Sequence, residues 1–291
     1  MRLSALNAII TGANQGLGLA IAEEFIKEGA SILICARDQD KLTDAANHLK
    51  ALATSGQKVY SMKVDVSDED EVKRFIEFGI KTLKTIHVLI NNAGIYGPKG
   101  CIADVDSKSW KQAFDVNLFG TFYTCKYILN HMKKNNYGKI INVSGGGSGA
   151  LPTISAYVTS KTAVIRFTET IAQEYAPYHI DINAIAPGAL NTRLLDEVLT
   201  AGSDIIDKKF YEKSLKQKKN GGVALSVGAR LCVYLASKDS DGITGKLISA
   251  VWDPYNDFKN HIDDLKDTDV YTLRRIVPKE RGMTWDPNGD K

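Results

Sequence analysis

The stretch that decides the fold is NAIITGANQGLG, residues 7–18, which joins a short apolar run to a turn with three glycines. The run at 7–10 predicts a buried strand, and Leu17, Ile21 and Phe25 then recur with a helical period. A strand, a glycine turn and a helix in that order form a phosphate cradle, because a helix N-terminus presents unpaired N–H groups to an anion. The spacing is G-x-x-x-G-x-G rather than the common G-x-G-x-x-G. The stretch therefore predicts a dinucleotide-binding α/β domain.

Strands and helices alternate along the rest of the chain up to about residue 251. This alternation predicts a doubly wound, Rossmann-type fold: a mostly seven-stranded parallel sheet with helices on both faces, formed by residues 1–251. Residues 252–291 form an extension, which is rich in aromatic side chains and too short to fold alone. Further strands are expected at 31–36, 59–63, 87–90, 140–143 and 181–186, with a last strand ending at Val251, and helices over 40–53, after 68–71 and over 107–134.

Tyr157 and Lys161 lie four residues apart, on one face of a predicted helix. A phenol ordinarily titrates near pH ~10, and a neighbouring ammonium lowers that pKa toward the range used in general acid–base catalysis. Ser144 follows the strand at 140–143, so its hydroxyl is expected at the carboxyl edge of the sheet, where open α/β proteins bind ligands. The same tyrosine–lysine spacing occurs twice more in the chain without a serine thirteen residues upstream. Only the Tyr157–Lys161 pair, with Ser144 upstream, therefore predicts a catalytic site.

Composition excludes several other classes of protein. The 291 residues are 44% hydrophobic and carry a net charge of +3 with both signs interspersed, so no nucleic-acid partner is expected. The four cysteines show no C-x-x-C pairing, and the histidines show no metal-ligand spacing, which predicts a cytoplasmic protein without a metal site. No apolar run reaches membrane-spanning length, and no signal peptide is evident. The densest basic stretch is interpreted as a solvated face; it contains Lys213, Lys216, Lys218 and Lys219.

Taken together, the motifs resemble those of the short-chain dehydrogenases/reductases, over about residues 6–251. The resemblance rests on the glycine turn at 11–18, Asp65, the NNAG run at 91–94, Asn117, Ser144, the Tyr157–Lys161 pair and residues 187–192.

The resemblance implies a catalytic set of Asn117, Ser144, Tyr157 and Lys161. In this reading Ser144 hydrogen-bonds the substrate carbonyl, Tyr157 gives it a proton, and Lys161 binds the nicotinamide ribose and lowers the tyrosine pKa. Asn117 holds a water beside Lys161. It also implies a substrate-binding segment at 190–222. The implied cofactor-binding residues are Gly12, Asn14, Gln15, Gly16, Leu17, Gly18, Arg37, Asp65, Val66, Asn91, Ala93, Gly94, Tyr157, Lys161, Pro187, Gly188 and Thr192.

The end of the second strand indicates which dinucleotide binds. Enzymes that use NAD often place an acidic residue there for the ribose hydroxyls. Here Ala36 is neutral and Arg37 is basic, which suits a 2′-phosphate and predicts NADP(H) rather than NAD(H). The alternative for Arg37 is a surface ion pair with Asp38 or Asp40.

The predicted function is transfer of a hydride between NADP(H) and a ketone or secondary alcohol, with a small molecule as substrate. Two alternatives stay open: a dinucleotide-binding regulator without turnover, and a sugar-nucleotide-modifying enzyme on the same fold. We expect a homodimer or homotetramer, because the helices at 107–134 and 157–176 carry apolar side chains on more than one face. The extension at 252–291 is expected to pack on the domain, against the substrate segment, or on a neighbouring subunit. The identity of the substrate is not specified by any residue of 190–222.

Overall fold

A computed structural model describes residues 1–145 and 149–285 of the chain. Its centre is one sheet of seven parallel strands in the order β3-β2-β1-β4-β5-β6-β7, which confirms the predicted doubly wound fold. The strand order changes direction between β1 and β4, the place where such sheets bind ligands. The strands are β1 (Asn7–Thr11), β2 (Ser31–Ala36), β3 (Val59–Lys63), β4 (Val88–Asn91), β5 (Gly138–Val143), β6 (Ile180–Ala186) and β7 (Leu247–Ser249).

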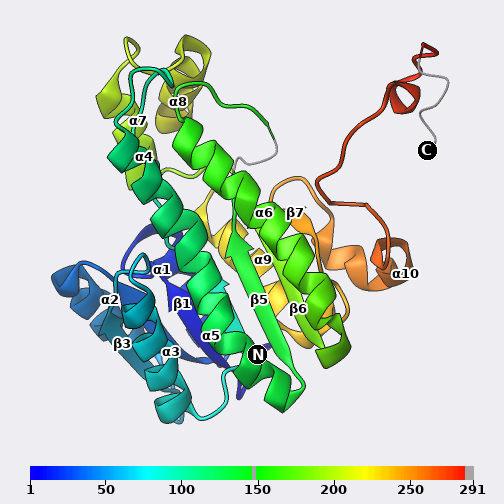
Figure 1. Cartoon of the computed structure of the whole chain (residues 1–291). Coiled ribbons are helices and arrows are strands. Elements are labelled where there is room, and N and C mark those ends of the chain that lie inside the picture. The colour runs from blue at the N-terminus through cyan, green and yellow to red at the C-terminus, as the bar shows by residue number, and fades with distance from the viewer. Residues whose placement is uncertain (146–148, 286–291) are drawn as a thin grey trace.

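Helices cover both faces of the sheet (Figure 1). Helices α1, α2 and α9 share one apolar cluster with one face, and α3, α5 and α6 share a second cluster with the other. Both faces are therefore buried, which explains why the strands are continuous apolar runs. The helices are α1 (Gly16–Lys27), α2 (Gln39–Leu52), α3 (Glu69–Leu83), α4 (Ser107–Phe114), α5 (Gly120–Asn135), α6 (Ser155–Tyr175), α7 (Arg193–Ala201), α8 (Lys208–Asn220), α9 (Leu225–Ala236) and the short α10 (Ile262–Leu265).

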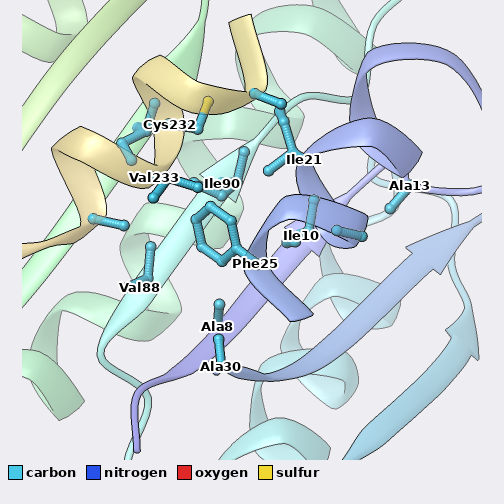
Figure 2. Close-up of a cluster of buried hydrophobic side chains, with 14 of the residues drawn as sticks. Ala8, Ile10, Ala13, Ile21, Phe25, Ala30, Val88, Ile90, Cys232 and Val233 are labelled. Atoms are coloured by element: carbon cyan, nitrogen blue, oxygen red, sulfur yellow. The ribbon is translucent and has the colours of Figure 1, made fainter. Parts of the chain in front are cut away.

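The packing of α1 and α9 on the sheet sets the position of the glycine turn. Phe25 of α1 is fully buried and lies between that helix, α9 and the central strands (Figure 2). Ile10 of β1 and Ile90 of β4, which are partners in the sheet, belong to the same cluster. Because α1 begins directly after the turn, this packing holds the start of α1 at the carboxyl end of β1.

The helical stretch predicted at 107–134 is divided into three parts. Between α4 and α5 lies a π-helical turn, Asp115–Phe119, which contains Asn117. Single π-helical turns of this kind are rare and occur frequently at functional sites.

The last strand ends earlier than predicted, at Ser249 instead of Val251. The backbone turns there because the N–H of Ser249 donates to the Asp253 carboxylate and the N–H of Asp253 donates back to the Ser249 carbonyl. Val251 instead lies beside Gly188, where a Cβ atom would stand 2.8 Å from its Cγ2.

The extension packs on its own domain as far as residue 273. Phe258 and Leu265 are buried in the cluster that contains α9, and the carbonyl of Tyr271 accepts from the N–H of Leu247 in β7. The N–H of Leu273 donates to Glu169 of α6 at 2.6 Å. Beyond this point the described residues, 274–285, run outward from the domain (Figure 1). The hydrogen bonds of Tyr271 and Leu273 join the extension to β7 and α6, and its expected contact with the segment 190–222 stays a prediction.

Two further findings bear on the sequence expectations. The four cysteines are free, and three of them, Cys35, Cys125 and Cys232, are buried. Within the described ranges, no helix combines the length and the apolar character needed to cross a membrane.

Candidate active site

The glycine turn and the NNAG loop after β4 are joined by hydrogen bonds. The Thr11 hydroxyl accepts from the N–H groups of Asn92 and Ala93, at 3.0 and 3.1 Å. The Asn92 amide donates in return to the carbonyls of Thr11 and Gly12. Gly12 has φ +65°, and a Cβ atom there would lie 2.8 Å from the Ala93 Cα. Only glycine fits between these two loops. Because it has no side chain, the backbone at the start of α1 stays open to a ligand.

A cavity of about 1460 Å³ extends from this turn across the carboxyl ends of the strands to α7 and α8. Ligand pockets commonly measure ~300–1,000 Å³, so this cavity has room for a dinucleotide and a second molecule. It is lined by most of the residues predicted to contact the cofactor: Gly12, Asn14, Gln15, Gly16, Leu17, Arg37, Val66, Ala93, Gly94, Tyr157, Lys161, Pro187, Gly188 and Thr192.

Two of the predicted cofactor residues act behind the cavity wall. A Cβ atom on Gly18 would lie 2.3 Å from the carbonyl oxygen of Gly12, so this glycine lets α1 pack closely against the turn. The Asp65 carboxylate accepts from the N–H and hydroxyl of Ser67 and lies 3.8 Å from Arg37. Neither residue is among the described residues that line the cavity.

Asn91, implied above as a cofactor-binding residue, is buried and is also not among the described residues that line the cavity. Its amide donates to Asn142 of β5 at 2.9 Å and accepts from the Thr124 hydroxyl of α5 at 2.7 Å. Asn142 donates onward to Thr168 of α6. Asn91 thus belongs to a buried polar chain that joins two strands to two helices, and its neighbour Asn92 lines the cavity instead.

Asn117 is fully buried in the π-helical turn. Its amide oxygen accepts from the N–H of Ile95, and its amide nitrogen donates to the Ile95 carbonyl and to the Ser160 hydroxyl. A Cβ atom on Gly94 would lie 3.2 Å from the Asn117 Oδ1 and 3.3 Å from the Lys161 Nζ. Asn117 is therefore next to Lys161, although the water that it is expected to hold stays a prediction.

Helix α6 carries Tyr157 and Lys161 into the cavity one turn apart. The Lys161 Nζ donates to the Val143 carbonyl at 2.6 Å, and burial lowers the pKa of this lysine to about 8. Burial, and secondarily the adjacent Tyr96, raises the pKa of the Tyr157 phenol. This direction is opposite to the expected depression by Lys161, because desolvation disfavours the phenolate. At neutral pH the phenol keeps its proton and the lysine keeps its charge.

Ser144 is placed differently from the expectation. Its hydroxyl is fully buried and donates to the Lys161 carbonyl at 3.1 Å, and the residue is not among the described cavity-lining residues. The next residue, Gly145, lines the cavity at φ +92°, and its Cβ position would lie 2.7 Å from the Tyr157 hydroxyl. The predicted bond from Ser144 to a substrate would require its hydroxyl to leave the Lys161 carbonyl.

The sequence interpretation missed several cavity residues. Tyr96, two residues after the NNAG loop, packs edge-on against Tyr157 with ring centroids 4.5 Å apart. Burial, with a smaller effect of Glu197, raises the pKa of Tyr96 to about 12. Its position directly after the loop was the available signal. Other residues came together only through folding: Asn92, Leu151, Lys41, Lys209, Phe210 and Lys213.

The end of the cavity beside β2 carries charges of both signs. Arg37, Asp38 and Lys41 line it; Asp38 caps α2 by accepting from the Lys41 N–H, and its carboxylate lies 3.4 Å from the Lys41 Nζ. The ion pair of Arg37 is with Asp65, at 3.8 Å, instead of the alternative partners Asp38 or Asp40. Both Arg37 and Asp65 are substantially exposed, so this contact is weak and leaves the guanidinium accessible. The open glycine turn and this end of the cavity together fit a dinucleotide.

Within residues 1–145 and 149–285, no group of three or more His, Cys, Asp or Glu side chains is arranged to hold a metal ion.

Known proteins share both the sequence and the fold. The family model described as short chain dehydrogenase matches residues 6–201. The chain is 33% identical to dehydrogenase/reductase SDR family member 4 of Caenorhabditis elegans, over 83% of this chain and 92% of the relative. It is 36% identical to 2-(R)-hydroxypropyl-CoM dehydrogenase of Xanthobacter autotrophicus, over 82% and 94%. The solved structure of NAD⁺-bound xylitol dehydrogenase superposes with a TM-score of 0.77 at 26% identity, covering 86% of this chain and 98% of that one. The chain therefore belongs to the short-chain dehydrogenase family, whose members are NAD(P)-dependent oxidoreductases acting on CH–OH and C=O groups.

Proposed function

We propose that this protein interconverts ketones and secondary alcohols with NADP(H), and that Tyr157 is its general acid and base. The proposal is carried by one observation: Tyr157, Lys161 and the glycine turn border the same cavity. A bound nicotinamide supplies the hydride chemistry, and the protein supplies orientation and proton transfer.

In the reducing direction the Tyr157 phenol donates its proton to the carbonyl oxygen of the substrate as negative charge develops there. Burial keeps this phenol protonated at neutral pH, which is the form that a donor needs. In the oxidising direction the phenolate accepts the proton of the alcohol, and the charge of Lys161 favours that phenolate. Asn117 holds the loop at Ile95 and, in our proposal, orders a water beside Lys161.

We propose a contact for each group of cofactor-binding residues from its position in the cavity. The turn at Gly12 and Gly16, with Thr192 beside it, would hold the pyrophosphate at the start of α1. Val66 would contact the adenine, and Pro187 and Gly188 would border the nicotinamide.

We propose NADP(H) as the preferred cofactor. The accessible guanidinium of Arg37 can bind a 2′-phosphate through charge-assisted hydrogen bonds, with Lys41 nearby. No carboxylate stands at position 36 to bind the free ribose hydroxyls. A structural neighbour with the same fold binds NAD⁺, so the proposed preference for NADP(H) depends on these side chains and not on the fold.

We also propose a homo-oligomer formed through α5 and α6. Phe119, just before α5, and Phe122 on α5 are 43% and 37% exposed, and Phe122 lies edge-on to Phe167 of α6. Large exposed aromatic side chains grouped on two adjacent helices favour burial against a second copy.

Replacement of Tyr157 tests the catalytic proposal. Tyr157→Phe is expected to lower kcat by roughly 10²–10⁴-fold, because it removes the positioned acid, and to leave the Kd of NADPH nearly unchanged. Turnover of a panel of ketones is followed at the nicotinamide absorbance band. Tyr234→Phe is the matched control, since Tyr234 and Lys238 have the same spacing outside the cavity. Wild-type kcat in Tyr157→Phe would refute the assignment.

A further inference from the structure

One face of α8 borders the catalytic end of the cavity. The cavity-lining residues of this helix are Lys209, Phe210, Lys213, Ser214 and Gln217, which recur at the three- and four-residue spacing of a single helical face. Helix α8 lies with α7 beyond the carboxyl ends of the strands (Figure 1). The lysines of the basic stretch are exposed, in line with the interpretation as a solvated face, and one of them, Lys213, also lines the cavity.

The apolar contacts of Phe210 place this face beside the reacting groups. Phe210 packs around the same small buried cluster as Tyr157, Tyr96 and Leu151. Lys209 precedes Phe210 directly, and Lys213 lies one turn after it. The two lysines therefore lie at the end of the cavity beside Tyr157, where the proposed function places the substrate. Arg37 lies at the opposite end, next to the carboxyl end of β2, where the proposed function places the adenosine of the cofactor.

Several acidic side chains around α8 have partners of their own. Asp196 pairs with Lys218 at 2.6 Å, and Glu197 pairs with both Lys99 and Arg193. Asp207 caps α8 by accepting from the Phe210 N–H. Glu212 lies between the two lysines on α8 but is not among the described residues that line the cavity.

Lys209 and Lys213 are the lysines of α8 that line the cavity. In the described part of the chain, neither ammonium group has a carboxylate within ion-pair distance. Two like charges four residues apart on a helix repel each other, so an anion between them would relieve that repulsion. An ammonium is a point charge with several donors, which suits a carboxylate or a phosphate equally.

We propose that Lys209 and Lys213 form a subsite for an anionic oxygen group of the substrate. This inference rests on the proposed function and narrows it: the substrate is a ketone or secondary alcohol with an apolar body and a carboxylate or phosphate at its far end. The aromatic walls formed by Tyr96 and Phe210 contact the apolar body, and the lysines hold the anion while Tyr157 faces the reacting oxygen.

Binding without turnover is the first test. Calorimetry in the presence of NADPH compares para-isopropylbenzoate with its uncharged methyl ester, and para-isopropylphenyl phosphate serves as the phosphate probe. The wild type is expected to bind either anion at least about tenfold more tightly than the ester, as two partly exposed charge pairs would provide. Lys209→Gln/Lys213→Gln should remove that difference. Lys208→Gln/Lys216→Gln removes the same charge from the same helix outside the cavity and should retain it.

Turnover is the second test, with para-acetylbenzoate and its methyl ester as paired ketones. The cavity double variant is expected to raise KM for the acid roughly tenfold, with little change in kcat and no change for the ester. Added salt should raise KM for the acid in the wild type, because exposed charges are screened. Inactivity toward both ketones together with selective anion binding would count against the proposed reaction and in favour of the subsite.

Three results would overturn the subsite. The first is equal affinity of the wild type for the acid and the ester. The second is an equal loss of anion binding in the control variant, which would show a general effect of the charge on α8. The third is a rise in the Kd of NADPH in Lys209→Gln/Lys213→Gln as large as that for the anion, which would assign both lysines to the cofactor.

Discussion

A Cβ atom on Gly145 would lie 2.7 Å from the hydroxyl of Tyr157. Gly145 is therefore the residue after β5 that faces the phenol, while the hydroxyl of Ser144 donates to the backbone carbonyl of Lys161. The glycine keeps free the space next to the reacting group. The adjacent serine holds the end of β5 to α6, the helix that carries both the tyrosine and the lysine.

Substitutions at these two positions should have different effects. Gly145→Ala places a methyl group against Tyr157 at a positive φ, so we expect kcat to fall by roughly 10²-fold, as for other small displacements in active sites. Ser144→Ala removes one buried hydrogen bond, so we expect a loss of about 1 kcal/mol in the free energy of unfolding and kcat within about tenfold of the wild type. Steady-state kinetics and urea unfolding measure both. A loss of ~10²–10³ in kcat for Ser144→Ala would instead give Ser144 the expected bond to the substrate.

Lys161 should make stability depend on pH. Burial lowers its pKa from 10.5 to about 8, so between these values the unfolded chain holds a proton that the folded chain has released. The free energy of unfolding therefore rises with pH across this window, by at most about 1.4 kcal/mol per pH unit from this group. Lys161→Met lacks this contribution, and subtracting its urea-unfolding curves from those of the cofactor-free wild type isolates it. Lys126→Met, at an exposed lysine paired with Glu69, should leave the slope intact. If the free energy of unfolding changed with pH equally in the wild type and in Lys161→Met, the lowered pKa of Lys161 would be contradicted.

Arg37→Ala should narrow the difference in affinity between NADPH and NADH. Loss of the charge-assisted bonds to the 2′-phosphate, worth about 1.5–3 kcal/mol, should weaken NADPH binding roughly 10–100-fold and leave NADH binding unchanged. Titration of nicotinamide fluorescence gives both Kd values. Arg230→Ala is the control, because that arginine is exposed, hydrogen-bonds to Ser226 on its own helix and is not among the described residues that line the cavity. Tighter or equal binding of NADH by the wild type would rule out the preference for NADP(H).

Charges on the exposed aromatic face should break the assembly. Phe119→Lys/Phe122→Lys places two charges where the proposed interface buries two rings, so we expect a smaller species in light scattering coupled to size exclusion. Leu52→Lys is the matched control, since Leu52 of α2 is similarly exposed, at 39%, away from this face. A monomeric wild type at micromolar concentration would disprove the assembly itself.

Two deletions should distinguish what the packed part of the extension, up to residue 273, contributes to stability from what the residues after it contribute. Removing 256–291 exposes the surfaces that Phe258 and Leu265 cover, each worth about 1.5–3 kcal/mol of burial, so Tm should fall clearly. NADPH binding should persist, because no described residue of the extension lines the cavity. Removing 275–291 alone keeps Phe258, Leu265 and the bond from Leu273 to Glu169, and should leave Tm nearly unchanged. Calorimetric melting of both variants decides the matter: an unchanged Tm after the longer deletion would mean that the packed part contributes nothing.

The sequence by itself determined the family and the fold. Alternating apolar runs and helical periods led to the doubly wound sheet, because buried parallel strands and amphipathic helices differ in period. The glycine turn could be recognised for the same local reason: Gly12 and Gly16 adopt a positive φ that other residues avoid. Tyr157 and Lys161 were found from their spacing on one helix.

Tertiary structure decided which of the predicted residues reach the cavity. Asn91 and Asn92 are adjacent and chemically identical, yet alternation along the strand end buries Asn91 in the core and turns Asn92 to the cavity. Ser144 and Gly145 differ in the same way, and no motif spacing specifies which of two neighbours faces a helix packed across the sheet. Lys209 and Lys213 lie some fifty residues after Tyr157, and only the folding of α8 over the strand ends brings them to the same cavity. The pKa of Lys161 likewise depends on burial, which is a property of packing and not of sequence spacing.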